Sequence, residues 1–142
     1  MTVLDTSGVI DYLLADGVAE EVRDLLARGS SAAAPELLVF EVLAVLRRDV
    51  SRGTLGADRA SSAVDDLSDL AVDLFPSLPL RRRAFGLRHN LTAADALFVA
   101  LAELLGEPLA TKDRGLAAAA REHADVPVLL LGVGGDDPDL AA

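Results

Sequence analysis

The sequence contains no cysteine, no tryptophan and a single lysine, and its only histidines are His89 and His123. Without cysteine there can be neither a disulfide framework nor a thiolate zinc site, and two histidines offer little material for an imidazole-based metal site. Any metal bound by this chain must therefore be held by oxygen ligands.

Long apolar runs are also missing, since none approaches the roughly 18 residues that a membrane span needs. The first residues lack the basic stretch and apolar core of a secretory signal. We therefore expect a protein that does not enter a membrane and works in the cytoplasm. The 142 residues suit one domain over residues 1–142, in which residues 132–142, rich in Gly and Asp, form a flexible acidic tail.

The formal net charge is −10, which argues against a protein that coats nucleic acid with a broad basic face. An enzyme that binds one nucleic-acid backbone locally is still compatible with this charge. Basic residues gather in three places: Arg47, Arg48 and Arg52; Arg81, Arg82, Arg83 and Arg88; and Lys112 with Arg114. Cations late in a helix stabilise its negative end, so a surface or capping role suits the first group. For Arg81 to Arg83, surface and phosphate-binding roles both stay open.

Short apolar runs alternate with longer stretches of helical period. The runs predict strands at residues 2–5, 32–34, 72–75, 108–111 and 126–131. Helices are predicted at residues 6–14, 18–28, 35–52, 57–70, 80–88, 92–105 and 115–124, with Pro35 at the first position of the third. This alternation predicts an α/β fold, with a central parallel sheet of four to five strands flanked by helices on both faces.

Four acidic residues lie in apolar surroundings: Asp5, Glu41, Asp95 and Asp113. An ionised carboxylate in such surroundings costs several kcal/mol unless it is paired or bound to a metal. Asp5 and Asp113 follow predicted strands, and ligands of parallel α/β sheets collect at the carboxyl ends of the strands. If those two strands are neighbours, both carboxylates face one crevice. Glu41 and Asp95 share helical faces with apolar residues, so each helix can aim its acid at the same edge.

Each acid also has an ordinary structural explanation. Asp5 and Asp113 could cap the helices that follow them, and Asp95 could form a capping box with Thr92. Glu41 is in mid-helix, so its alternative is a buried pair with an arginine from elsewhere. Glu36 is a rival to Glu41, but its position at the helix start suits an interaction with the helix dipole.

Four segments carry a family resemblance: VLDTS at residues 3–7, APELL…EV…LRR at residues 34–48, LRHNLTAADALFVALAE at residues 87–103, and LATKDRGL at residues 109–116. In this order and spacing they resemble the PIN-domain ribonucleases, in particular the VapC-type toxins of bacterial toxin–antitoxin pairs. The resemblance covers nearly the whole chain and implies the three-layer PIN-like fold.

Oxygen ligands without histidine or cysteine select Mg²⁺ or Mn²⁺. We therefore expect Asp5, Asp95 and Asp113 to be direct ligands, with Glu41 acting through water or in proton removal. Ser7 and Thr111 are expected to hold carboxylates in place.

The resemblance implies a metal-dependent endoribonuclease that cuts single-stranded or looped RNA and leaves a 5′-phosphate. It also implies a neutralising antitoxin, a homodimer and a toxin–antitoxin hetero-oligomer. Arg81, Arg82, Arg83 and Lys112 are the expected RNA contacts. The alternative is a catalytically inactive PIN fold that serves as a partner-binding module.

Overall fold

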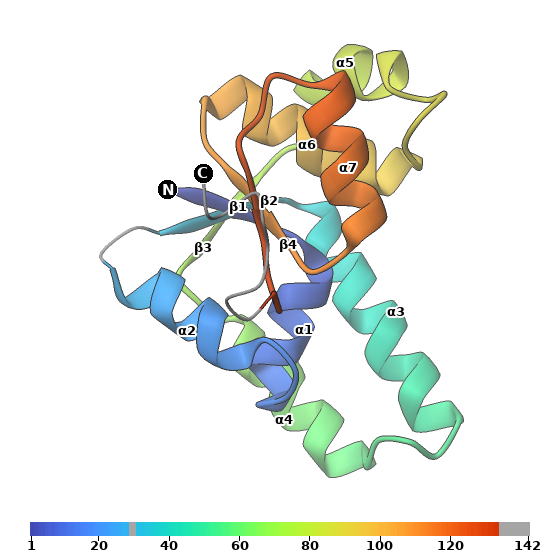
Figure 1. Ribbon diagram of the computed structural model, residues 1–142. Helices are drawn as coiled ribbons and strands as arrows, with labels where there is room; N and C mark the ends of the chain where they lie inside the picture. Colours follow the sequence, from blue (N-terminus) through green and yellow to red (C-terminus); the bar gives the residue numbers. More distant parts are fainter. Residues whose placement is uncertain (29–30, 134–142) are drawn as a thin grey trace.

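The computed structural model describes residues 1–28 and 31–133, and the fold is built around one parallel sheet (Figure 1). Its strands follow the order β3-β2-β1-β4-β5, and all four neighbouring pairs are parallel. The strands are β1 (Thr2–Leu4), β2 (Ala32–Pro35), β3 (Val72–Phe75), β4 (Leu109–Thr111) and β5 (Val128–Leu130). The predicted parallel sheet is confirmed, with five strands.

Helices cover both faces of this sheet, which gives three layers. In Figure 1, α1 to α4 lie below the sheet and α5 to α7 above it. The lower layer contains α1 (Thr6–Leu14), α2 (Ala19–Ala27), α3 (Leu37–Ser51) and α4 (Ala57–Leu67). The upper layer contains α5 (Arg81–Gly86), which follows a short 3₁₀ turn (Leu78–Leu80), α6 (Ala93–Leu105) and α7 (Arg114–His123).

The chain reverses its direction of winding at β1, because β2 and β3 lie on one side of this strand and β4 and β5 on the other. The carboxyl ends of β1 and β4 therefore meet at a switch point, where ligands of such sheets bind. The two strands are joined by main-chain bonds, and the amide of Asp5 donates to Ala110 O at 3.0 Å. The predicted neighbourhood of the strands before Asp5 and Asp113 is confirmed.

Several predicted boundaries are wrong. Pro35 is the last residue of β2, and α3 begins at Leu37. The fixed φ of proline suits a strand end as well as a helix start, so the sequence does not decide between them. The helix predicted to Leu70 ends at Leu67, and the last strand is shorter than predicted. Most of the predicted tail, residues 134–142, lies outside the described residues.

The core lies on both sides of the central strands. Phe98, Val99 and Leu101 of α6 are fully buried, and this helix contacts β1, β2 and β4. Residues 32–34 of β2 are buried alanines that point alternately to the two faces of the sheet, and their small side chains let helices approach closely on both sides. Gly106, at φ +65, ends α6 as predicted. Packing of α6 on the middle of the sheet fixes the place of Asp95 in its first turn.

None of the helices within the described part of the chain has both the length and the apolar character needed to cross a bilayer.

Replacement of Phe98 by alanine should lower the free energy of unfolding by about 3–5 kcal/mol, because it leaves a cavity in the centre of the core. The matched control is Phe85→Ala, since Phe85 is 68% exposed and contacts the Arg88 guanidinium from the surface. That control should cost no more than about 1 kcal/mol. Urea denaturation followed by circular dichroism measures both, and equal losses would contradict the assigned core.

Candidate metal and catalytic site

Asp5 is the most firmly held of the four acids. It follows β1, is only 7% exposed, and its carboxylate accepts hydrogen bonds from Thr6 N at 2.7 Å, Ser7 Oγ at 3.2 Å and Thr111 Oγ1 at 2.8 Å. Burial raises the pKa of Asp5 above its ordinary value, and these hydrogen bonds oppose the rise. Asp5 also caps α1, so the capping explanation is confirmed for this residue. Capping uses one carboxylate oxygen, while Ser7 and Thr111 orient the other.

Asp113 lies at the start of α7 and is linked to Asp5 through one side chain. Its carboxylate accepts from Leu116 N at 3.0 Å, which confirms the predicted cap. Its own amide donates to Thr111 Oγ1 at 3.0 Å, and the same hydroxyl donates to Asp5. Thr111 therefore holds the ends of β1 and β4 in register and fixes the two acids relative to each other.

Glu41 approaches the same place from α3. Its side chain is half-buried, and Oε1 accepts a hydrogen bond of 2.7 Å from the Thr6 hydroxyl. The partner of Glu41 is thus a hydroxyl from the first turn of α1, and the alternative of a buried arginine pair is wrong. Since Thr6 also donates its amide to Asp5, this residue joins two of the acids.

Asp95 enters from α6, on the other face of the sheet. The hydroxyl of Thr92 accepts from Asp95 N at 3.2 Å, which is one half of the predicted capping box. Burial raises the pKa of Asp95 to about 6, and the charges of Asp5, Asp113 and Glu41 add to the rise. Asp5, Glu41 and Asp113 thus lie at one edge of the sheet, and Asp95 on α6 is under the influence of their charges.

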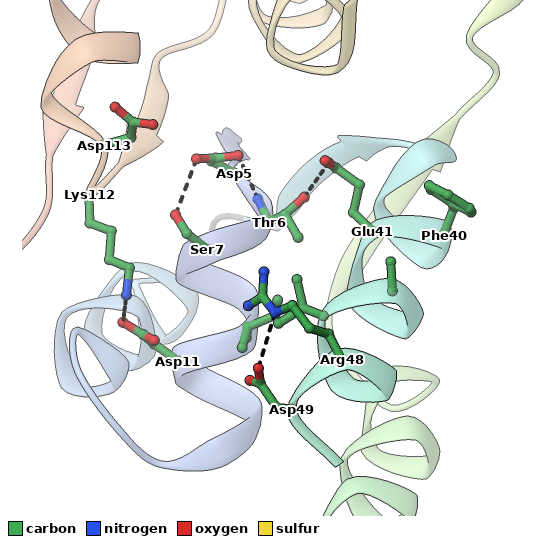
Figure 2. A pocket seen from close by; sticks show the side chains of 13 residues that line it. Asp5, Thr6, Ser7, Asp11, Phe40, Glu41, Arg48, Asp49, Lys112 and Asp113 are labelled. Atoms are coloured by element: carbon green, nitrogen blue, oxygen red, sulfur yellow. Dashed lines mark hydrogen bonds and ion pairs between the residues drawn. The ribbon is translucent and has the colours of Figure 1, made fainter. Parts of the chain in front are cut away.

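A cleft of about 710 Å³ opens beside Asp5, Glu41 and Asp113 (Figure 2). In that view the three acids lie together at the top, and Arg48 with Asp49 and Lys112 with Asp11 lie below them. The sequence analysis missed Thr6, Asp11, Phe40 and Asp49 as cleft residues and gave Arg48 a surface or capping role. Thr6 lies directly after Asp5, and Arg48 follows Glu41 by two helical turns, so helical spacing alone could have indicated both.

The four expected RNA contacts divide between two places. Lys112 lines the cleft, where its ammonium lies 2.7 Å from Asp11. The three arginines belong to α5, where Arg81 lines a separate groove and Arg82 is exposed. Arg83 makes two hydrogen bonds to the carboxylate of Glu103, at 2.7 and 3.0 Å, and lowers the pKa of that group. Arg83 thus ties α5 to α6, and contact of Arg81, Arg82 and Arg83 with RNA stays a prediction.

The donor set fits a hard divalent ion, because all four side chains offer carboxylate oxygen. Among residues 1–28 and 31–133, no three acidic or histidine side chains already stand in an arrangement that encloses a metal. Mg²⁺ is commonly held by one or two carboxylates together with waters and substrate phosphate, so a closed cage is not required. Asp5 and its neighbours are therefore suited to a partly open site.

The family model of the PIN domain matches residues 2–122 of the chain. The chain belongs to the PIN-domain family. Its similarity to the ribonuclease VapC1 of Mycobacterium tuberculosis reaches 41% identity over 118 residues, which are 82% of this chain and 89% of that protein.

Solved structures with this PIN-domain fold include VapBC2 from Rickettsia felis, bound to a DNA fragment from its promoter. It aligns with a TM-score of 0.68 at 12% identity and covers 92% of this chain and 98% of its own. A toxin–antitoxin complex from Klebsiella pneumoniae aligns with a TM-score of 0.58 at 19% identity, covering 91% and 96%. These likenesses confirm the predicted three-layer α/β architecture.

The raised pKa of Asp95 predicts how the stability of this PIN domain depends on pH. An acid whose pKa is 3.8 in the unfolded chain and about 6 in the folded one keeps its proton up to a higher pH when the protein is folded. The free energy of unfolding is therefore greatest below pH 3.8, and it falls as the pH rises from there through about 6, the pKa of Asp95 in the folded state. With metal removed by chelator, Asp95→Asn should lose this decline and exceed the wild type above pH 6, by on the order of 1 kcal/mol after screening.

Thermal melts between about pH 4 and pH 7, followed by circular dichroism, measure this difference. Asp66→Asn, at an exposed acid of α4, is the control and should follow the wild-type curve. If the Asp95→Asn curve ran parallel to the wild type, the coupling of Asp95 to the other acids would be wrong.

Proposed function

We propose that this chain is an Mg²⁺- or Mn²⁺-dependent endoribonuclease and the toxin of a toxin–antitoxin pair. The observation that supports this most directly is the gathering of three carboxylates, Asp5 after β1, Glu41 of α3 and Asp113 after β4, around one cleft at the switch point of the sheet, with Asp95 of α6 under the influence of their charges. Membership of the PIN-domain family and 41% identity to a protein named a ribonuclease support the same conclusion. Such an enzyme works in the cytoplasm, where its RNA substrate is made.

Asp5, Asp95 and Asp113 would hold the ion. When bound, the ion neutralises charge on the phosphate and lowers the pKa of a water molecule. Asp5 needs little reorganisation to act as a ligand, because Ser7 and Thr111 already orient one of its carboxylate oxygens. Asp113 is held in place by its cap on α7 and by Thr111.

Glu41 is the group proposed to take the proton of the attacking water. The Thr6 hydroxyl fixes one of its oxygens at 2.7 Å, which leaves the other oxygen for a water in the cleft. A positioned base contributes about 10²- to 10⁴-fold to rate. Because the amide of Thr6 is also bonded to Asp5, the position of Glu41 relative to Asp5 is fixed.

The partner proposed for this chain is an antitoxin protein, because the solved structures that share its fold include a toxin–antitoxin complex. A site that attracts cations can be filled by a basic side chain, and the planar fork of arginine pairs with carboxylates in two places. The chain is also proposed to form a homodimer and, with the antitoxin, a hetero-oligomer.

The first test of this function is cleavage of RNA with and without metal. Wild type should cut single-stranded RNA in Mg²⁺ or Mn²⁺ and lose this activity in excess chelator. Asp95→Asn and Glu41→Gln should each reduce the rate by about 10²-fold or more. Asp66→Asn on α4 is the control and should cut at the wild-type rate.

Melting with metal separates this function from the alternative of an inactive binding module, in which Asp5 and Asp113 serve only as helix caps. Saturating Mn²⁺ should stabilise wild type by about 2.7 kcal/mol at 100 times its dissociation constant, and Asp95→Asn by less. If Mn²⁺ left the melting temperature of wild type unchanged and wild type cut no RNA, the inactive binding module would be supported.

The expected antitoxin contact can be tested on the complex. If an arginine of the antitoxin fills the cleft beside Asp5 and Glu41, its replacement by glutamine should release ribonuclease activity while the two proteins stay associated. A structure of the complex in which the acids stay open to solvent would contradict occlusion by arginine.

A further inference from the structure

Two cation–carboxylate pairs line the part of the cleft below Asp5, Glu41 and Asp113 (Figure 2). Lys112 Nζ lies 2.7 Å from Asp11 Oδ2, and Arg48 Nε lies 3.2 Å from Asp49 Oδ1. Lys112 comes from the end of β4 and Arg48 from α3, so the cations enter the cleft from different elements. They adjoin the acids but bond to none of Asp5, Glu41 or Asp113 in the described structure.

In both pairs the cation is more accessible than its carboxylate. The side chain of Lys112 is 40% exposed and that of Asp11 12%, whereas Arg48 is 51% exposed and Asp49 27%. Asp11 is also held by Val18 N, which donates to its Oδ2 at 3.1 Å. Asp11 is thus a fixed support for Lys112, and the more exposed cations of both pairs extend into the cleft. The Arg48–Asp49 pair is largely exposed and contributes little to stability, so a phosphate can replace that contact. At Lys112 a phosphate would share the ammonium with the buried Asp11.

The floor between the pairs is apolar. Ile10 of α1 and Ala44 and Val45 of α3 line the same cleft. An ion with six waters fills only about 200 Å³, at roughly 30 Å³ for each water. The volume of about 710 Å³ therefore leaves room for a larger ligand beside the acids. That ligand should carry negative charge for the cations and an apolar face for the floor.

We propose that Arg48 and Lys112 form a subsite for the nucleotide next to the cleaved bond of a single-stranded RNA. Its phosphates bind the two cations, and its base lies against Ile10 and Val45. A base can make this contact only when it is unpaired, so the subsite selects single strands over duplex. The proposal rests on the ribonuclease function above and describes how the same cleft holds its substrate.

The charges of the residues that line the cleft favour a metal ion at one end and a phosphate at the other. Five carboxylates and two cations line the cleft, and a polyanion would be repelled if all five were unpaired. Pairing with Lys112 and Arg48 offsets the charges of Asp11 and Asp49. The unpaired negative charge is thereby confined to the metal-binding end, and the other end can accept phosphate.

The test is steady-state cleavage of a mixed-sequence single-stranded RNA oligonucleotide in Mn²⁺ by Arg48→Gln, Lys112→Gln and the double variant. Each single change should raise KM about tenfold, because a charge-assisted hydrogen bond to phosphate is lost. The kcat should stay near wild type, since these contacts exist equally before and during reaction. Each change should also reduce the salt dependence of log kcat/KM by about 0.7 in slope.

Arg47→Gln is the matched control, because Arg47 is the neighbour of Arg48 on α3 and faces a different groove, between α3 and α4. It should leave KM and the salt slope unchanged. Lys112→Arg keeps the charge and should restore most of the affinity that Lys112→Gln loses. Arg48→Gln, Arg47→Gln and Lys112→Arg should melt at the wild-type temperature, which separates loss of contact from loss of folding. Lys112→Gln should melt lower, because it leaves the buried carboxylate of Asp11 without its cation.

The outcomes distinguish this subsite from the function on which it rests. A wild type that cuts no RNA in Mn²⁺ would overturn the ribonuclease function and the subsite with it. A wild type that cuts RNA while Arg48→Gln and Lys112→Gln behave like Arg47→Gln would overturn the subsite alone. A fall in kcat at unchanged KM would also overturn it, because the cations would then act on the reacting centre.

Discussion

The hydrogen bonds that converge on Asp5 join the parts of the molecule on which the site depends. The Thr6 amide begins α1, the Ser7 hydroxyl orients the same carboxylate, and the Thr111 hydroxyl reaches it from the end of β4. Thr111 also accepts from the amide of Asp113, and the hydroxyl of Thr6 extends the network to Glu41 on α3. Three of the four acids are therefore positioned by hydroxyl and amide groups, which fix geometry without neutralising charge. This leaves the carboxylates free to bind a cation.

Such a network has a cost, because it holds like charges close together. Burial raises the pKa of both Asp5 and Asp95, and the charges of the other acids raise the pKa of Asp95 further. The basic residues that line the cleft, Lys112 and Arg48, are paired with Asp11 and Asp49 and offer no direct relief. Without metal, burial of these carboxylates and the repulsion between them thus lower the free energy of unfolding. Such a loss of stability is common where function needs unpaired charge. A divalent ion would remove this opposition.

How far the sequence predicts the site depends on the range of the interactions involved. Asp5 and Asp113 could be placed because the edge of a parallel sheet brings strand ends together whatever the details of packing. The partner of Glu41 could not, since the approach of Thr6 depends on how α1 and α3 pack, across 35 residues of sequence. The bond of Arg83 to Glu103 could not be predicted either, because it depends on how α5 packs on α6, twenty residues further along the chain. Arg48 was interpreted as a helix-end cation, although its spacing of two helical turns from Glu41 puts both side chains on the face of α3 that borders the cleft.

Capping and catalysis are often treated as competing explanations for an acid near a helix start, but here the geometry allows both. Asp5 and Asp113 each accept a bond from the first turn of their helices and still border the cleft. A helix start carries positive potential, so it stabilises the charged form of the carboxylate that it holds. Neutralising either acid would therefore weaken a helix cap and a proposed metal ligand together, whereas at Asp95 the capping contact is made by the hydroxyl of Thr92. Of the aspartates proposed as ligands, Asp95 is thus the one whose charge can be removed with least disturbance to the helix it belongs to.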